Sequence, residues 1–361
     1  MKVLCLTTNI STVGGIERVM SVLANRLVHE DNIEIQISSL YKYEIRNPSF
    51  KIDEKVKLKY HDFEVFTPRN TKDKILQNIN QFQAVKKVLK EEDYDLIMTF
   101  HPHISVPVIL YKLLLKKKCI VTEHSSYENC TKIWRVMRSL TYKYADKVVV
   151  LTESNRKKYA RFSPKNLIVM PNPIPFKTLE TSSLKQKRII SVGRLEAEKG
   201  FERLIDIYKI IADNCLEWSL DIIGDGTQKE LLLKKISENN LEDRIHIIPF
   251  TDDVLSEYLN ASICVIPSYT EAFPMVLLEA MHCGLPVVSF NFLGAKEILA
   301  DSDFGLLVEQ NDIEQFSTYL LNLISDYEFR LIQGSRGRKL SEKYTIDNII
   351  KEWKLIINEL R

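Results

Sequence analysis

The sequence predicts an α/β protein with two doubly wound parallel-sheet domains. Short apolar runs alternate with longer amphipathic runs along the 361-residue chain, as expected for parallel strands joined by right-handed helical crossovers. One series of runs ends in the proline cluster PNPIP at 171–175, and a second series begins at Arg188. A chain of this length suits two domains of ordinary size, each able to bury its own core.

In the first series, apolar runs mark strands and periodic apolar positions mark helices. We expect strands at 2–8, 34–40, 56–60, 96–99, 118–122, 147–151 and 166–170, and helices at 16–28, 71–92, 104–115 and 134–145. The segment between the second and third strands is polar and hairpin-like.

The predicted helix at 71–92 carries five lysines, which are Lys72, Lys74, Lys86, Lys87 and Lys90. The simpler interpretation is that they form a solvated helix face. The alternative is a surface helix that meets acidic lipid headgroups or a lipid pyrophosphate.

In the second series, strands are expected at 188–192, 218–223, 245–248 and 262–266, with helices at 201–212, after the GDG of 224–226 and from Pro274, and a mostly helical tail over 313–361. The proline cluster and the polar stretch 177–187 form the clearest linker. We therefore expect an N-terminal domain over 1–175, a C-terminal domain over 188–340 and a last helical segment over 341–361.

The composition excludes several classes of protein. Lys plus Arg number 50 and Asp plus Glu 48, so the net charge of +2 argues against nucleic acid as the main partner. The six cysteines are scattered without a CxxC spacing, as expected for reduced, mostly buried thiols in a cytoplasmic protein. The N-terminus is too short and polar for a signal peptide. The longest apolar run, 104–115, falls short of the roughly 18 residues that a membrane-spanning helix needs.

Segment 268–290, SYTEAFPMVLLEAMHCGLPVVSF, holds two acids eight positions apart, Glu271 and Glu279. Pro274 suits the first position of a helix that a glycine and a proline close. The unpaired N–H groups and the partial positive charge at that helix start favour phosphate oxygens. These N–H groups belong to Phe273, Met275 and Val276. Both carboxylates are predicted to face one ligand there. The alternative is a buried helix with one acid near its favourable end and one solvated acid.

Three further patterns point to an anionic ligand. Arg194 and Lys199 lie five apart in a loop between a strand and a helix, where a diphosphate could bridge them; a structural role is the alternative. Gly14 and Gly15 precede a helix and allow a ligand close to the backbone, although by themselves they are explained more simply by a tight turn. His124 follows a strand, at the sheet edge where ligands bind in such folds; the alternative is a hydrogen-bonded loop histidine.

Two nearby histidines do not extend this set of candidates. His101 and His103 follow another strand, but a pair of histidines without a third ligand does not make a zinc site.

Taken together, these motifs resemble the family-4 retaining glycosyltransferases. The family signature EGFPxxxxEAMxxGxPVV corresponds to segment 271–288, with Ala272 in place of the usual glycine. VGGIERV resembles the family's GGxER loop, GRLEAEKG its GRLxxEKG loop, and EHS its donor-sugar histidine, in family order over roughly 2–305. The resemblance implies the GT-B fold, with two Rossmann-like domains facing a central cleft. It also implies a last helix, beginning near Tyr344 and Thr345, that returns to the N-terminal domain.

The resemblance also implies roles for individual residues. Arg194 and Lys199 would stabilise the leaving diphosphate of a nucleotide sugar, Glu271 would bind hydroxyls of the donor sugar, and Glu279 those of the ribose. His124 would contact the sugar near the acceptor. These roles make His124, Arg194, Lys199 and Glu271 the catalytic set. The nucleotide-sugar-binding set is Gly14, Gly15, Asn172, Gly193, Pro249, Phe250, Phe273, Pro274, Met275, Val276 and Glu279. Pro249 and Phe250 would flank the base, but Pro249 stands where the family usually has a glycine.

The implied reaction is glycosyl transfer with retention of the anomeric configuration, without a cofactor or a metal. DxD spellings occur at Asp93 with Asp95 and at Asp301 with Asp303, but neither pair is placed among the donor motifs. The paired carboxylates also suggest a hydrolase. We disfavour that alternative because Glu279 lies within a helix, beside the expected ribose.

The segments TEHSSYE, KIWR and FNFLGAKEI resemble bacterial transferases that build capsule, O-antigen and protein-linked oligosaccharides on a polyprenyl pyrophosphate carrier. This likeness implies a UDP-linked hexose or N-acetylhexosamine donor and a lipid-linked saccharide acceptor. It also implies a cytoplasmic protein, peripheral on the inner face of the membrane. A GT-B nucleotide-sugar epimerase or phosphorylase, or a silent sugar-nucleotide binding protein, remains the alternative.

Overall fold

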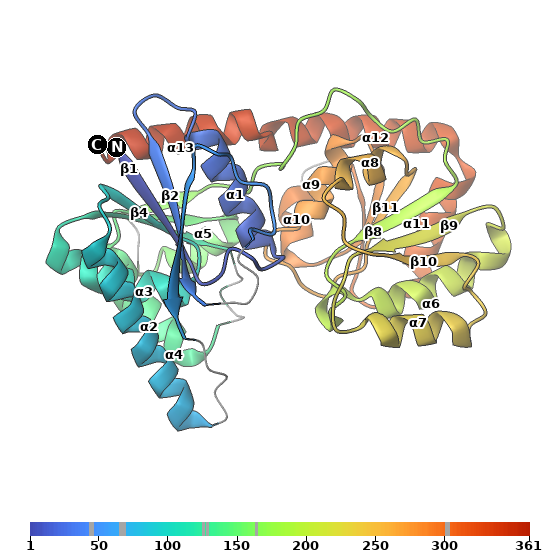
Figure 1. The fold of residues 1–361 in the computed structure, drawn as a ribbon. Helices are drawn as coiled ribbons and strands as arrows, with labels where there is room; N and C mark the ends of the chain where they lie inside the picture. Colours follow the sequence, from blue (N-terminus) through green and yellow to red (C-terminus); the bar gives the residue numbers. More distant parts are fainter. Residues whose placement is uncertain (43–46, 65–69, 125–126, 128–129, 163–164, 300–303) are drawn as a thin grey trace. The chain divides into compact units, whose positions relative to one another are not determined.

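The computed structural model describes residues 1–42, 47–64, 70–124, 127, 130–162, 165–299 and 304–361. The chain forms two compact units (Figure 1). Unit 1 contains residues 1–173 and 347–361, and unit 2 contains residues 174–346. The polar segment 177–187 therefore belongs with unit 2. There the N–H of Ser182 donates to the carbonyl of Cys283 at 2.9 Å and the side chain of Leu184 is buried.

Unit 1 is built on a parallel sheet in the strand order β3-β2-β1-β4-β5-β6-β7. The strands are β1 (Lys2–Thr7), β2 (Glu34–Tyr41), β3 (Lys57–Phe63), β4 (Leu96–Thr99), β5 (Lys118–Glu123), β6 (Lys147–Val150) and β7 (Leu167–Val169). The helices are α1 (Gly15–Leu27), α2 (Thr71–Glu91), α3 (Pro102–Leu115), α4 (Lys132–Thr141), α5 (Glu153–Tyr159) and α13 (Ile346–Glu359). The central strands are buried on both faces, which explains their nearly continuous apolar sequences.

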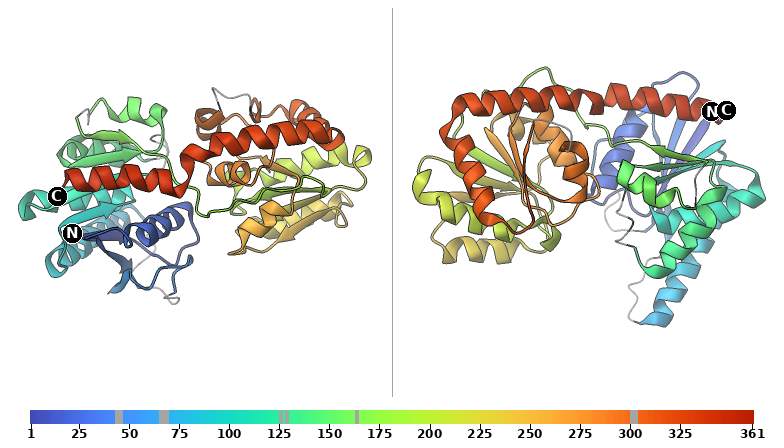
Figure 2. Two further views of the ribbon diagram at one scale, coloured as in Figure 1. Left: turned by 90° about the horizontal axis from the view of Figure 1, so that it is seen from above. Right: turned by 180° about the vertical axis from the view of Figure 1, so that it is seen from behind.

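Unit 2 contains a second parallel sheet in the order β10-β9-β8-β11-β12-β13. The strands are β8 (Arg188–Val192), β9 (Ser219–Ile223), β10 (Ile245–Ile248), β11 (Ile263–Ile266), β12 (Val287–Phe290) and β13 (Leu306–Val308). The helices are α6 (Phe201–Ile211), α7 (Lys229–Glu238), α8 (Val254–Leu259), α9 (Met275–His282), α10 (Leu293–Leu299), α11 (Ile313–Ser325) and α12 (Tyr327–Ser341). In this unit α6 and α7 lie on one side of the sheet, and α8 and α9 on the other (Figures 1 and 2).

The predicted fold class is confirmed, since the strands of each sheet are all parallel and helices connect successive strands. Each unit has its own hydrophobic core, formed by its strands and by the helices packed on them. The carboxyl ends of the parallel strands meet at one edge of each sheet, and we call that edge the ligand edge of the unit.

Two features of the first sheet differ from the sequence prediction. The hairpin-like region between β2 and β3 is not a hairpin, because the two strands pair in parallel, with Ile37 opposite Leu58. The connection over 42–56 is long enough to cross over, whereas hairpin loops usually have about two to five residues. Helix α5 was also not predicted. Its sequence is short and polar, and its signal is the N-cap Thr152, which accepts from the N–H of Asn155 at 3.1 Å.

Candidate active site

The predicted donor-site residues of unit 2 gather at its ligand edge. Strands β8 and β11 are neighbours at the centre of the sheet, and the strand order runs outward in opposite directions from them. Such a switch point is where open α/β sheets bind ligands. Arg194 and Lys199 follow β8, and Glu271 follows β11. The two loops that carry the predicted cations and the donor-sugar acid therefore flank the switch point.

Lys199 and Glu271 form an ion pair, with Nζ and Oε2 3.0 Å apart. The side chains are 18% and 12% exposed, so the pair is shielded from solvent yet reachable. The hydroxyl of Ser268 donates to Oε1 of Glu271 at 2.6 Å and fixes the carboxylate. Arg194 lies farther out, at 55% side-chain exposure, with Nη2 3.3 Å from Oε1 of Glu198. The structure thus joins Lys199 to Glu271 and leaves Arg194 mainly exposed.

Two glycines let these loops pack directly on one another. Gly200 has a φ of +68°, and a Cβ there would lie 2.2 Å from the carbonyl oxygen of Pro267. Gly294, in α10, approaches the Glu271 loop in the same way: a Cβ would lie 2.7 Å from Cδ of Pro274 and 2.8 Å from the carbonyl oxygen of Glu271. Any side chain at either glycine would displace the loop that carries Glu271.

Helix α9 begins one residue later than the sequence predicts. Pro274 is the N-cap, with φ −76° and ψ 101°, and its carbonyl accepts the bond from the N–H of Leu277 at 3.2 Å. The extended ψ places Pro274 before the helix, so Met275 is the first helical residue. The N–H groups of Met275 and Val276 belong to the first turn, where helices lack internal partners. The ring of Phe273 is buried, with its centroid 6.0 Å from that of Tyr344.

The second predicted acid does not share the setting of the first. Glu279 is fully buried, and the hydroxyl of Tyr258 donates to its Oε2 at 3.0 Å. Glu271 keeps exposed surface at the ligand edge, whereas Glu279 lies within the packed body of α9. In this structure the two carboxylates therefore lie in different settings, with Glu271 partly exposed and Glu279 buried against Tyr258.

The loop after β10 presents an aromatic surface. Phe250 is 40% exposed, and its N–H donates to Oδ2 of Asp225 at 2.9 Å. Asp225 belongs to the GDG segment, where a Cβ on Gly224 would lie 2.0 Å from the carbonyl oxygen of Gly193. The loops after β8, β9 and β10 are thus linked at the same edge, with Pro249 and Phe250 at its outer end.

Arg203 is a component of this site that the sequence did not reveal. It is 5% exposed, and its guanidinium donates to the carbonyls of Pro267 and Ser268, both at 2.7 Å. The guanidinium carbon lies 3.8 Å from the ring centroid of Tyr269 and 3.7 Å from that of Phe290. Burial lowers the pKa of Arg203 to about 10. Arg203 therefore remains charged and clamps the segment that leads to Glu271.

Gln310 completes this clamp. Its Oε1 accepts from Arg203 at 2.9 Å, and its Nε2 lies 3.3 Å from the carbonyl oxygen of Asn291 and 3.4 Å from that of Ser268. The available sequence signal was an arginine among the buried positions of α6. Sequence alone does not show which backbone carbonyls it reaches.

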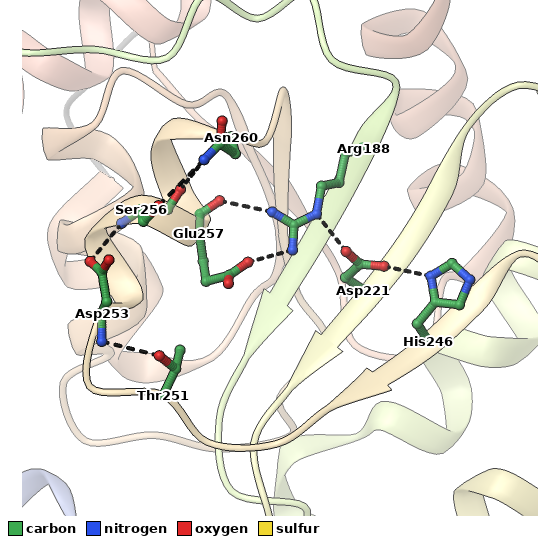
Figure 3. Close-up of polar contacts among 8 residues, drawn as sticks. All are labelled: Arg188, Asp221, His246, Thr251, Asp253, Ser256, Glu257 and Asn260. Carbon is green, nitrogen blue, oxygen red and sulfur yellow. Dashed lines mark hydrogen bonds and ion pairs between the residues drawn. The ribbon is translucent and has the colours of Figure 1, made fainter.

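A second polar network supports α8 (Figure 3). Arg188 forms ion pairs with Asp221 and Glu257, and Asp221 lies 2.8 Å from Nδ1 of His246. Arg188 is the first residue of β8, so this network starts at the sheet edge opposite the donor loops. It connects three strands to α8, the helix that supplies Tyr258 to Glu279.

At the ligand edge of unit 1, Gly14 is the N-cap of α1 and Gly15 its first residue. A Cβ on Gly14 would lie 2.6 Å from Oε2 of Glu17, the end of a flexible side chain. Oε1 of Glu17 in turn lies 3.5 Å from Nε2 of His101. His101 therefore pairs with a carboxylate in this loop cluster.

His124 is held in a neutral, half-buried setting at this edge. Its ring stacks on Phe100 with the centroids 5.7 Å apart, and its Nε2 lies 3.1 Å from Oγ1 of Thr122. Burial lowers the pKa of His124 to about 3, nearby His101 adds to the lowering, and a hydrogen bond with Asn172 opposes it. His124 and Asn172 also line the same small cavity. The structure thus brings these two predicted residues together.

A buried network fixes the end of β5 directly before His124. Glu123 and Arg138 are fully buried, and Nη1 of Arg138 lies 2.9 Å from Oε2 of Glu123. The hydroxyl of Tyr159 donates to the same oxygen at 2.9 Å, and that of Tyr142 donates to Oε1. Burial raises the pKa of Glu123 despite these favourable partners. The sequence analysis did not identify this network.

The histidine and DxD residues that the sequence analysis considered as metal ligands do not join these loops. The ring of His103 packs edge-on against Trp134 at 4.3 Å. Asp93 pairs with Lys2, and Asp95 accepts from the N–H of Lys2 at 2.8 Å, at the sheet edge opposite His124. Asp301 and Asp303 lie outside the described residues. Within the ranges that the structure describes, no group of three or more His, Cys, Asp or Glu side chains is arranged to hold a metal ion.

Two units that each contain a Rossmann-like parallel sheet are the architecture of the GT-B fold. The chain matches the family described as "Glycosyltransferase Family 4" over residues 13–177 and the one described as "Glycosyl transferases group 1" over residues 177–340. It is also 32% identical to an uncharacterized glycosyltransferase of Haemophilus influenzae, over 97% of this chain and 98% of that protein. The chain belongs to glycosyltransferase family 4.

Two further relatives carry named activities or pathways. The amylovoran biosynthesis glycosyltransferase AmsD of Erwinia amylovora is 29% identical, over 99% of each chain. A Campylobacter jejuni enzyme is 27% identical over 96% of each chain; its name describes an α-1,4-N-acetyl-D-galactosaminyltransferase acting on a saccharide linked to PP-undecaprenol. The chain therefore has relatives in polysaccharide and lipid-linked oligosaccharide assembly.

Solved structures share the fold at low sequence identity. Sucrose-phosphate synthase of Thermosynechococcus elongatus superposes with a TM-score of 0.82 at 18% identity, over 99% of this chain and 98% of that one. Anabaena Alr3699/HepE, solved in complex with UDP, gives a TM-score of 0.79 at 17% identity, over 99% of this chain and 100% of that one.

Among the described residues, no helix has both the length and the apolar character needed to cross a bilayer.

Proposed function

We propose that this chain is a retaining glycosyltransferase that moves a hexose or N-acetylhexosamine from a UDP-linked donor to a polyprenyl-pyrophosphate-linked saccharide. The observation that carries the proposal is the shielded ion pair between Lys199 and Glu271 at the switch point of the second sheet. Lys199 lies on the loop after β8, and Glu271 lies on the loop that leads into α9. It brings a cation suited to diphosphate and an acid suited to sugar hydroxyls within 3.0 Å of each other.

In this proposal, the bond from the anomeric carbon to the diphosphate oxygen breaks and its electron pair leaves with the nucleotide. Arg194, Lys199 and the N–H groups at the start of α9 stabilise the charge that develops on the diphosphate. A hydroxyl of the acceptor bonds to the anomeric carbon on the face that the diphosphate leaves, and its proton passes to the departing phosphate oxygen. Fixed cations supply the charge stabilisation that a metal gives in other transferases, so no divalent ion is required.

The remaining residues orient the donor sugar and the nucleoside. Glu271, held by Ser268, accepts hydrogen bonds from sugar hydroxyls. His124 is neutral because burial lowers its pKa to about 3, so it can exchange hydrogen bonds with hydroxyls without adding charge. Glu279, oriented by the hydroxyl of Tyr258, binds the ribose, and Phe250 lies against the base.

The relatives support the proposed acceptor and location. The name of the Campylobacter relative specifies an undecaprenol-PP-linked acceptor, and AmsD is named for polysaccharide biosynthesis. The HepE structure contains UDP, which supports the UDP-linked donor. We propose that this chain acts in the assembly of bacterial surface polysaccharide or oligosaccharide, at the cytoplasmic face of the membrane.

The test is to incubate the protein with a panel of nucleotide sugars, with and without a lipid-pyrophosphate-linked saccharide, and to follow free nucleotide. The proposal predicts nucleotide release that depends on acceptor, an α-linked product by NMR, and unchanged rates in chelator. Donor turnover without acceptor would instead identify an epimerase or phosphorylase, and binding without turnover a silent binding protein. Activity lost in chelator and restored by magnesium would refute the metal-independent mechanism.

A further inference from the structure

We infer that the outward face of α3 and α4 docks this protein on an anionic bilayer. This docking face consists of seven exposed apolar side chains: Leu110, Leu113, Leu114, Ile133, Val136, Leu140 and Tyr144. The inference rests on the proposed function, because a polyprenyl-linked acceptor is presented at a membrane surface. It adds which surface of this chain meets the lipid.

Helix α4 is apolar on two faces, and only one of them is packed against the protein. The buried face carries Trp134, Arg138 and Thr141. The opposite face carries Ile133, Val136 and Leu140, which are 73%, 56% and 57% exposed. Their spacing of three and four residues places them on one stripe of the helix. Exposed large apolar side chains aligned in this way mark a surface for a further partner.

Helix α3 packs beside α4 and adds further exposed apolar side chains. The rings of His103 and Trp134 meet at the start of the two helices, at 4.3 Å, and Nζ of Lys112 donates to the carbonyl of Tyr144 near their far end, at 2.9 Å. The two helices therefore run side by side in the same direction. On α3, Leu113 and Leu114 are 50% and 77% exposed. Seven of the 22 large apolar side chains that are exposed in the described part of the chain lie on this pair of helices and the turn after α4.

Cations outnumber acids around the docking face. Residues 96–122 and 129–145 contain no Asp or Glu and eight Lys and Arg, of which Arg138 is buried in an ion pair with Glu123. Because the whole chain has a net charge of only +2, this is a local concentration of cations. Within the described ranges, no acidic side chain pairs with Lys132, Arg135 or Lys143. The adjacent acid, Asp146, is paired with Lys112 at 2.6 Å and with Lys118 at 3.8 Å.

This combination matches a lipid surface better than a protein partner. An interfacial helix buries its apolar stripe at the boundary of headgroups and acyl chains, while flanking Lys and Arg meet anionic headgroups. Protein interfaces, in contrast, are depleted in lysine. The lysine-rich helix α2 fits less well, because it also carries Asp73 and Glu91 and its Lys87 lies 4.0 Å from Glu91.

The experiment measures co-sedimentation of the full chain with phosphatidylcholine vesicles, with and without phosphatidylglycerol, at low and high salt. Each flanking cation contributes about fivefold to binding at an anionic surface. We therefore expect Lys132→Gln with Lys143→Gln to lower the partition coefficient about 25-fold at low salt. Ile133→Ser with Leu140→Ser should lower it at least tenfold at both salt concentrations. The matched control is Leu331→Ser with Ile332→Ser, which changes two exposed apolar residues of α12 in unit 2 and should bind as wild type does.

Three results would overturn the inference. The first is wild-type protein that does not bind phosphatidylglycerol vesicles, and the second is docking-face variants that bind as wild type does. The third is a self-association that Ile133→Ser with Leu140→Ser abolishes while vesicle binding persists, because the face would then contact a second copy. UDP binding, measured on the same variants, keeps this test separate from the proposed function. Wild-type protein that binds vesicles but does not bind UDP would count against the proposed function alone.

Discussion

Arg203 offers a quantitative test of how the donor loop is positioned. Its guanidinium donates to the carbonyls of Pro267 and Ser268, four and three residues before Glu271. Replacing Arg203 with Met keeps an unbranched apolar side chain, ends it where the guanidinium would begin and removes every donor. The segment that carries Glu271 then loses its anchor, although neither Lys199 nor Glu271 is changed. We expect Arg203→Met to weaken both stability and use of the donor.

The size of the stability effect follows from two opposing terms. Two backbone carbonyls lose a charged donor, at about 1–3 kcal/mol each, and the ring contacts with Tyr269 and Phe290 contribute about 1–2 kcal/mol more. Removing the buried charge stabilises the folded state by about 3 kcal/mol, because the desolvation that lowers the pKa of Arg203 from 12.5 to about 10 is then avoided. The net loss is about 2 kcal/mol, which lowers the Tm by about 4–8 °C for a domain of this size.

The functional effect is a loss of donor positioning. A shift of about 1 Å in a residue that orients substrate can cost about 10²-fold in rate, and we expect kcat/KM for the nucleotide sugar to fall at least tenfold. The matched control is Arg244→Met. Arg244 also donates to backbone carbonyls, those of Cys215 at 2.6 Å and Trp218 at 3.0 Å, but it precedes β10 at the edge opposite the donor loops.

Thermal unfolding, together with donor kinetics measured well below the Tm, separates the two effects of Arg203→Met. Arg244→Met should lower the Tm comparably and leave kcat/KM within about twofold of wild type. A fall in kcat/KM that is no larger for Arg203→Met than for Arg244→Met would refute a positioning role for Arg203.

Three further changes test other parts of the site. Gly294→Ala should raise KM for the donor several-fold with a smaller change in Tm, because its Cβ would lie 2.8 Å from the carbonyl oxygen of Glu271; unchanged donor kinetics would contradict this. Tyr258→Phe should weaken UDP binding in titration calorimetry, since it removes the hydroxyl that donates to Glu279; wild-type affinity would argue against that contact. His124→Gln should remove about 2 kcal/mol of acid destabilisation between pH 7 and pH 5 in urea unfolding. The unfolded histidine takes up a proton near pH 6.5, whereas folded His124 does so near pH 3, so stability falls as the pH drops through this window. Parallel pH dependence in the variant and wild type would refute it.

Much of the fold could be predicted because buried parallel strands have a simple local signal. The predicted bounds of β4, β8 and β10 match the structure, since each is a short run of mainly apolar residues. The parallel pairing of β2 and β3 could not be read from the intervening polar segment, because pairing direction depends on the path of the connection. Helix α5 lacks an apolar stripe and is marked only by its cap at Thr152.

The candidate site was only partly predictable for a related reason. The resemblance to family 4 supplies the candidate residues, and sheet topology explains why the loops of Lys199 and Glu271 meet. The clamp from Arg203 to Pro267 joins residues 64 positions apart, and no local pattern specifies such a pair. The burial of Glu279 against Tyr258 likewise depends on how α8 packs on α9.

The most direct test of the central claim is sugar transfer from the nucleotide sugar to the lipid-linked acceptor, measured for Lys199→Ala and Glu271→Ala. Each variant should lose about 10²-fold or more in kcat, because each removes a group that acts on the donor in the transition state. The matched control is Lys234→Ala, an exposed lysine of α7 that pairs with Glu238 at 3.7 Å, and it should retain the wild-type rate. Full transfer activity in either Lys199→Ala or Glu271→Ala would contradict the assignment of the donor site.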